Sequence, residues 1–115
     1  MNVIIAGGFH WSQNKSNWAW TYSVTAFVEI FNVASNTWRR GPDLPIPLAA
    51  SQMVEGPDGG VAVIGGTLDD DVKTFSDSLY YLPHAGPGAV WTKMQQKLKI
   101  ARANHVAFLV PDEYC

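Results

Sequence analysis

The fold is decided by the stretch Val3-Ile4-Ile5-Ala6-Gly7-Gly8, because a similar stretch, Val61-Ala62-Val63-Ile64-Gly65-Gly66, follows 58 residues later. Both stretches are short unbroken apolar runs rich in β-branched residues, which is typical of strands buried on both faces. A glycine pair at the end of a strand lets the backbone take a positive φ or pass close to another strand. The sequence therefore predicts two copies of one β-unit.

The remaining elements of each copy also recur in the same order. An apolar segment and then a tryptophan follow each glycine pair: residues 27–32 and Trp38 in the first copy, and residues 77–82 and Trp91 in the second. The spacing differs between the copies because loops change length more readily than strands do. A repeat of about 50 residues is typical of propeller blades.

Further short apolar or alternating segments predict strands over residues 50–54, 90–94 and 105–110. Clusters of proline and glycine separate these segments, as turns separate strands. Only residues 93–103 are compatible with a helix. Their place in the repeat, opposite a proline-rich connector of the first copy, favours a loop. We therefore expect an all-β chain.

An apolar run ending in Gly-Gly, an acidic-apolar-aromatic segment and a tryptophan, in this order, resemble the kelch repeat. The resemblance covers nearly the whole chain in about two repeats, and it implies β-propeller blades of four-stranded antiparallel sheets. Family members often carry an arginine after the tryptophan; Arg102 has this place in the second repeat, and Ala49 in the first. These motif residues have structural roles, so they indicate architecture rather than chemistry. The matching residues are Gly7, Gly8, Glu29, Phe31 and Trp38 in the first repeat and Gly65, Gly66, Asp77, Tyr81 and Trp91 in the second.

The strand count predicts an incomplete propeller within a single repeat segment, residues 1–115. Residues 3–49 form a first repeat that lacks its inner strand, and residues 50–104 form a second, whole repeat. Residues 105–110 are the inner strand of a next blade or a strand that closes the first. Propellers close with about four to eight blades. We therefore expect a piece of a longer propeller, or alternatively a ring of several copies or a two-blade wedge.

The composition excludes several classes of function. Eight Lys and Arg residues against ten Asp and Glu residues give a formal net charge of −2, which rules out a general electrostatic grip on nucleic acid or anionic lipid. A single cysteine, Cys115, rules out an internal disulfide and a cysteine-based zinc site. No apolar run approaches the ~20 residues of a membrane-spanning helix. With no recognisable export signal, the cytoplasm is the expected location.

The candidate binding residues lie on one loop face. In an antiparallel meander, the loops between the second and third strands and the connectors between blades emerge at the same end. Residues 9–26 form a long loop of this kind in the first repeat, and they are rich in tryptophan, which is enriched at binding hot spots. Phe9 and Tyr22 are expected to pack on their own loop or on a neighbouring blade. The candidates are His10, Trp11, Trp18, Trp20, Asp69, Asp70, Asp71 and Arg102.

Two classes of function remain, a binding module and an enzyme. The histidine spacing, the serines and the glycine-rich turns match no metal, nucleophile or phosphate motif, and the three adjacent aspartates lack an EF-hand pattern. We therefore expect no catalytic residue, metal or cofactor, and a protein partner rather than nucleic acid or membrane. The resemblance implies a substrate receptor of a ubiquitin ligase or an actin-associated scaffold. The alternatives are a fragment of a galactose-oxidase-like enzyme and a truncated product without a function of its own. Open blade faces also predict self-association.

Overall fold

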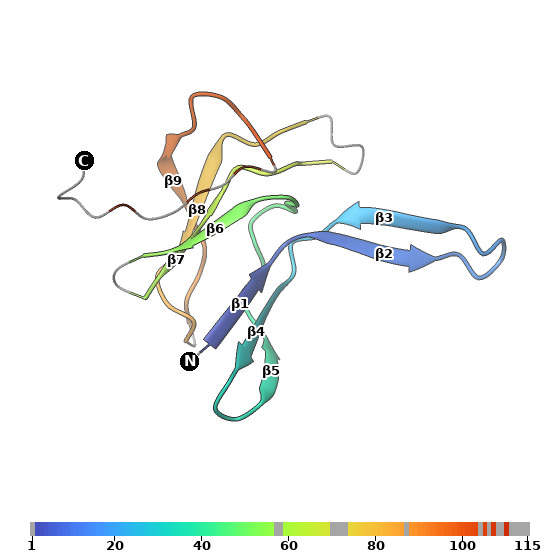
Figure 1. Cartoon of the computed structure of the whole chain (residues 1–115), viewed down its shortest axis with the longest axis horizontal. Helices are drawn as coiled ribbons and strands as arrows, with labels where there is room; N and C mark the ends of the chain where they lie inside the picture. Colours follow the sequence, from blue (N-terminus) through green and yellow to red (C-terminus); the bar gives the residue numbers. More distant parts are fainter. Residues whose placement is uncertain are drawn as a thin grey trace.

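The computed structural model describes residues 2–56, 59–69, 74–86 and 88–103, together with His105, Ala107 and Val110. Within these residues the chain forms nine strands and no helix (Figure 1). The strands make antiparallel sheets of three, two and four strands. The prediction of an all-β fold of antiparallel, blade-like sheets is therefore confirmed.

The second repeat, called unit 2 from here on, is a four-stranded meander. Each strand pairs antiparallel with the next one along the chain. This strand order is the one predicted for a whole blade. The strands are β6 (Gln52–Glu55), β7 (Val61–Ile64), β8 (Ser78–Leu82) and β9 (Thr92–Lys97).

Strand β9 corrects the expectation that residues 93–103 form a loop. The strand runs from Thr92 to Lys97 and pairs with β8, with Thr92 opposite Tyr81. The strand predicted over residues 90–94 is therefore present, but it begins at Thr92 and runs three residues further, over exposed polar residues that carry no apolar pattern. Backbone pairing with the free edge of β8 decides its conformation instead.

The first repeat, called unit 1, is a sheet of three strands in the order β1-β4-β5. These strands are β1 (Asn2–Ala6), β4 (Val28–Asn32) and β5 (Thr37–Arg40). Strand β1 lies at the edge of the sheet, and no described residue pairs with its other side, where unit 2 has its inner strand. The predicted strand over residues 105–110 lies largely outside the described residues, so its pairing is not assigned.

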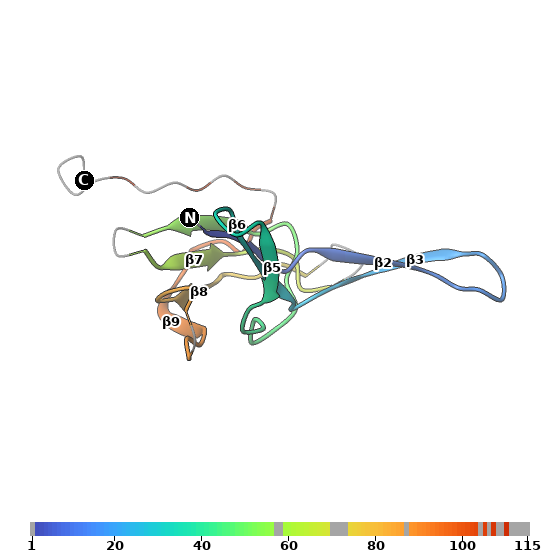
Figure 2. The ribbon, with the colours of Figure 1, turned by 90° about the horizontal axis from the view of Figure 1, so that it is seen from below.

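Between β1 and β4 the chain forms a further hairpin, which corrects the expectation of a loop over residues 9–26. Its strands are β2 (Phe9–Gln13) and β3 (Trp20–Val24), and they pair with each other alone. The hairpin projects away from both larger sheets, along the 57 Å long axis of the molecule (Figures 1 and 2). The aromatic and β-branched residues at alternate positions explain why these segments are strands.

The two glycine pairs have the same backbone conformation. The value of φ is 71° at Gly7 and 65° at Gly65, and it is 108° and 110° at the second glycine of each pair. A Cβ atom at Gly7 would collide with the carbonyl oxygen of Leu48, and one at Gly65 with that of Arg102. Glycine is the one residue that combines a positive φ with this close approach. The two predicted copies of one β-unit are therefore present.

Backbone hydrogen bonds show which residues of the two units correspond. The Gly7 N–H donates to the carbonyl of Phe27 at 2.9 Å, and the Gly65 N–H donates to that of Ser78 at 3.0 Å. The Phe27 N–H donates to the hydroxyl oxygen of Thr25, and the Ser78 N–H donates to that of Ser76, with 3.1 Å between donor and acceptor in both. The correspondence between β4 and β8 therefore differs from the match made in the sequence, by one position at Phe31 and by three positions at Glu29. Glu29 corresponds to Tyr80 and Phe31 to Leu82, where the sequence matched them with Asp77 and Tyr81.

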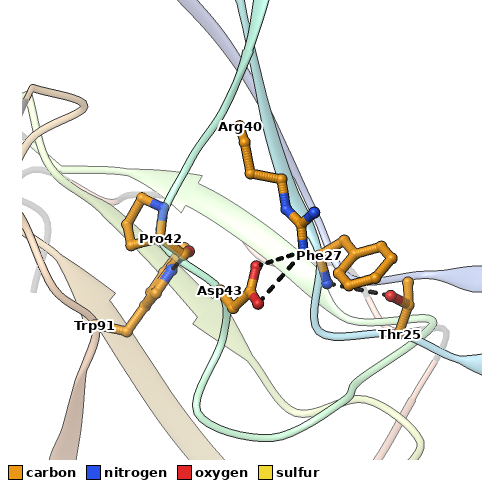
Figure 3. A network of polar contacts seen from close by, with 6 residues as sticks. All are labelled: Thr25, Phe27, Arg40, Pro42, Asp43 and Trp91. Carbon is orange, nitrogen blue, oxygen red and sulfur yellow. Dashed lines mark hydrogen bonds and ion pairs between the residues drawn. The ribbon is translucent and has the colours of Figure 1, made fainter.

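The core lies between the two units. Val28 and Ile30 of β4 are fully buried, and they pack with Val63 and Leu82 of unit 2. Burying a side chain of this size contributes about 2 kcal/mol. The indole N–H of Trp91 donates to the carbonyl oxygen of Pro42 at 2.8 Å, and this bond joins the units directly (Figure 3). The remaining buried members of the core are Leu44, Leu48, Val61, Tyr80 and Ala89.

Candidate functional site

Four aromatic side chains share one face of the β2–β3 hairpin. In an antiparallel pair, two residues directly opposite each other lie on the same face of the sheet. Residues two positions apart along one strand also share a face. The register places Trp11 opposite Tyr22 and Gln13 opposite Trp20. We call this side the aromatic face and the other side the polar face. The aromatic face holds Phe9, Trp11, Trp20 and Tyr22, and the polar face holds His10, Ser12, Thr21 and Ser23.

The aromatic rings pack on one another but remain open to solvent. Tyr22 lies at the centre, with its ring centroid 5.5 Å from that of Phe9 and 4.7 Å from that of Trp11. Trp11 and Trp20 are 58% and 62% exposed, whereas Phe9 and Tyr22 are 38% and 40% exposed. The packing of Phe9 and Tyr22 within their own segment agrees with the prediction. The two tryptophans are therefore the more exposed rings of this face.

Trp18 lies in the turn of the hairpin and has an unusual backbone conformation. Its φ is 60°, a value that favours glycine or asparagine over a bulky side chain. Two backbone bonds hold this turn, from the Trp18 N–H to the carbonyl of Asn14 and from the Asn14 N–H to the carbonyl of Ala19. Trp18 is 69% exposed. The turn thus presents a large apolar ring at the tip of the hairpin.

His10 lies apart from the candidate tryptophans. It occupies the polar face, where the hydroxyl oxygens of Ser12 and Thr21 are 3.2 Å apart. The sequence placed His10 and Trp11 in one candidate set, but adjacent residues of a strand point to opposite faces. His10 and the tryptophans of the candidate set therefore lie on opposite faces of the hairpin.

The connectors that follow β5 and β9, the last strands of the two units, lie at the same end of their unit as the glycine pair. An antiparallel meander is expected to have this arrangement. The second glycine of each pair donates its N–H to this connector, Gly8 to Leu48 at 2.7 Å and Gly66 to Arg102 at 2.8 Å. Arg102 therefore corresponds to Leu48 rather than to Ala49, with which the sequence aligned it. The Arg102 side chain is exposed, and its Nε donates to the carbonyl of Ile100 at 3.4 Å.

The acidic segment of unit 2 is described only in part. Asp69 is half-buried, and the buried hydroxyl of Thr67 donates to its carbonyl oxygen at 3.3 Å and to its carboxylate at 3.4 Å. Asp70 and Asp71, two of the candidate residues, lie outside the described residues. The geometry thus gives Asp69 a local structural contact.

Two hollows lie away from the hairpin. The larger, of about 410 Å³, lies between the units beside the edge strand β1, with Asn2 and Ile4 on one side and Met53 and Glu55 on the other. The smaller, of about 250 Å³, lies on unit 1 between Phe27, Glu29, Trp38 and the two arginines that end β5. Among the described residues no group of three or more His, Cys, Asp or Glu side chains is placed to hold a metal ion.

The last observations concern membrane-spanning segments and similarity to known proteins. No helix in the described part of the chain is long and apolar enough to cross a lipid bilayer. No protein-family model matches this chain, and a search of curated proteins finds no match for it. The kelch resemblance accordingly rests on this chain's own repeated residues.

Proposed function

We propose that this chain is a protein-interaction module built of kelch-type repeats. It binds a protein partner through the aromatic face and tip of the β2–β3 hairpin. The observation that carries this proposal is that the exposed rings gather on one side of a hairpin that projects from the sheets. The kelch resemblance extends the proposal to a substrate receptor or scaffold of the cytoplasm, of the kind that serves ubiquitin ligases or actin.

Tryptophan suits such a contact for physical reasons. A tryptophan buries about 150–250 Å² when covered, and it loses the freedom of only two side-chain angles. Trp11 is already held by Tyr22 at a ring distance of 4.7 Å, so little ordering remains when a partner binds. Replacing a hot-spot tryptophan by alanine costs about 2 kcal/mol or more.

The base of the hairpin is tied to unit 1, which gives the exposed face a fixed support. The Thr25 N–H donates to the carbonyl of Gly8 at 2.9 Å, and the Leu48 N–H donates to the carbonyl of Thr25 at 3.2 Å. The two strands leave the sheet from this closed base. The tryptophans are consequently displayed by a paired backbone rather than by an open loop.

The test compares the two faces of the same hairpin. A photo-crosslinking amino acid placed at Trp20 is expected to capture a partner in cells, whereas the same group at Thr21, on the polar face, captures none. With the purified partner, Trp11→Ala and Trp20→Ala should each weaken binding by about thirty-fold, which corresponds to 2 kcal/mol. The polar-face change Ser12→Ala is the matched control and should leave the affinity unchanged. Equal capture from both faces, or unchanged affinity in the tryptophan variants, would contradict the proposal.

A further inference from the structure

The contact between the two units joins opposite faces of similar sheets. Unit 1 contributes Ile4, Ala6, Val28 and Ile30 from β1 and β4, together with Leu48 from the connector. Unit 2 contributes Val61, Val63, Tyr80, Leu82 and Trp91. Because the units are copies of one another, each of these faces has a counterpart elsewhere in the molecule.

The backbone correspondence locates both counterparts. On unit 1, the side that points away from unit 2 is the counterpart of the face that unit 2 uses at the contact; we call this side of unit 1 the open face. On unit 2, the side that points away from unit 1 is the counterpart of the face that unit 1 uses at the contact; we call this side of unit 2 the outer face. The open face consists of Val3, Ile5, Glu29, Phe31 and Trp38, and the outer face consists of Ala62, Ile64, Leu79 and Tyr81.

The open face is apolar and uncovered. Val3 is 44% exposed and Trp38 is 55% exposed, whereas their counterparts Val61 and Trp91 are each 8% exposed. Trp38 stacks against Phe31 with 4.8 Å between ring centroids, and the hollow of about 250 Å³ lies beside it. The face therefore has the shape and chemistry of a blade surface without the blade that covers it.

We propose that the open face of one copy of this chain docks on the outer face of a second copy, repeating the contact between its own two units. Such a head-to-tail contact uses different surfaces on the two copies, so it generates a ring when the rotation closes. With two units in each copy, a ring of four to eight blades needs about two to four copies.

The charges at this contact support a second copy as the occupant. Two buried core residues at the contact between the units correspond to a charged residue in the other unit. Tyr80 corresponds to Glu29 on the open face, and Leu48 corresponds to Arg102 beside the outer face. These charges are opposite. Tyr80 and Leu48 belong to one buried cluster between the units, so docking would place the glutamate of one copy and the arginine of the next within the same contact. Charge complementarity of this kind selects the partner and the register.

Glu29 is available for this pair. Its cross-strand neighbour Arg40 bonds to Asp43 at 3.2 Å instead and lies over the ring of Phe27 at 3.9 Å (Figure 3). In the described part of the chain Glu29 has no ion pair, and the side chains of both Glu29 and Arg102 are exposed. A partner charge can therefore reach the carboxylate without breaking an existing contact of Glu29.

The test is the solution mass of the full chain, measured by light scattering after size exclusion. The wild type is expected to give the mass of about two to four chains of 12.6 kDa each. Glu29→Arg and Arg102→Glu should each raise the dissociation constant of the assembly about ten-fold or more, and the double variant should restore it. Both positions are exposed, so circular dichroism should show the fold unchanged in all variants.

Three outcomes overturn the proposal. If the wild type has the mass of one chain, a second copy does not cover the open face. A multimer that neither charge reversal weakens is held together elsewhere. A double variant that stays dissociated means that Glu29 and Arg102 do not meet. The control Trp11→Ala should leave the mass unchanged, so a failure here is distinguishable from a failure of the proposed hairpin function.

Discussion

At the scale of single residues, Trp18 combines a positive φ with an exposed side chain. A bulky residue at φ 60° costs about 1–2 kcal/mol relative to its preferred conformation. Strained residues persist where the surrounding structure holds them, and they cluster at binding and active sites. Here the turn bonds of Asn14 hold the conformation, and the ring they support is exposed. The turn therefore keeps a tryptophan where glycine would fit more easily.

The first prediction at this scale separates the shape of the turn from its ring. Trp18→Gly removes the strain but adds freedom to the unfolded chain, so the free energy of unfolding should change by less than about 0.5 kcal/mol. In Trp18→Val, the native turn would force a β-branched side chain into a positive φ that it strongly disfavours. The turn should therefore open. Hydrogen exchange at the Asn14 amide measures both effects. We expect unchanged exchange in the glycine variant and faster exchange in the valine variant; the reverse order would show that the turn does not depend on this φ.

A pair of tryptophans provides a second prediction. Trp91→Ala removes a buried ring and its bond to Pro42, so it should lower the free energy of unfolding by about 3–5 kcal/mol. Trp38→Ala changes the counterpart, which is 55% exposed, and should cost less than about 1 kcal/mol in the single chain. Urea unfolding of the dissociated Glu29→Arg background compares the two. Equal losses would mean that Trp38 is covered within one chain.

At the scale of elements, the β2–β3 hairpin is an insertion between two strands of unit 1. Its base closes at the bond between Thr25 and Gly8, and its strands pair with no other strand among the described residues. The ladder of β1 with β4 begins at Ala6 and Val28, on the sheet side of this base. The hairpin is therefore placed by unit 1 but contributes little to the core of the two units.

Removing the hairpin tests this independence. Replacing residues 9–24 by a short Asn-Gly turn should leave the fold unchanged, because no residue of the buried core lies in the hairpin. The number of chains in each assembly should also stay the same. The same change should abolish binding of the proposed partner. Circular dichroism and light scattering follow the fold and the assembly, and binding is followed with the purified partner. Loss of the fold would mean that the hairpin stabilises unit 1.

The aromatic face also shows how far the candidate site was predictable. Residue type and position in the predicted loop indicate Trp11, Trp18 and Trp20 as candidates, and these are the most exposed rings of the segment. The alternation of Phe9 with Trp11 and of Trp20 with Tyr22 was a period-two signal that pointed to strands, and a loop was expected instead. The register of the hairpin was needed to separate His10 from the tryptophans, since it decides which residues share a face.

At the scale of the whole molecule, two similar units stack so that one face of each is covered by the other. The fully buried side chains, such as Ile30 and Leu82, lie at this contact. The two faces that point away from it are left to solvent or to a further partner. The edge of β1 that no described residue pairs with, and the apolar open face, are therefore features of the assembly of units, rather than of either unit alone.

The sequence by itself determined the strands around the glycine pairs, the repeat and the all-β class. These features follow from local sterics and short-range patterns: positive φ at Gly7 and Gly65 requires glycine, and β-branched runs favour strands. The tertiary structure alone decided the correspondence of Phe31 with Leu82, the shared face of the hairpin rings, and the burial of Trp91 where Trp38 stays exposed. Register and burial depend on the neighbour that a strand meets, and that neighbour is distant in the sequence.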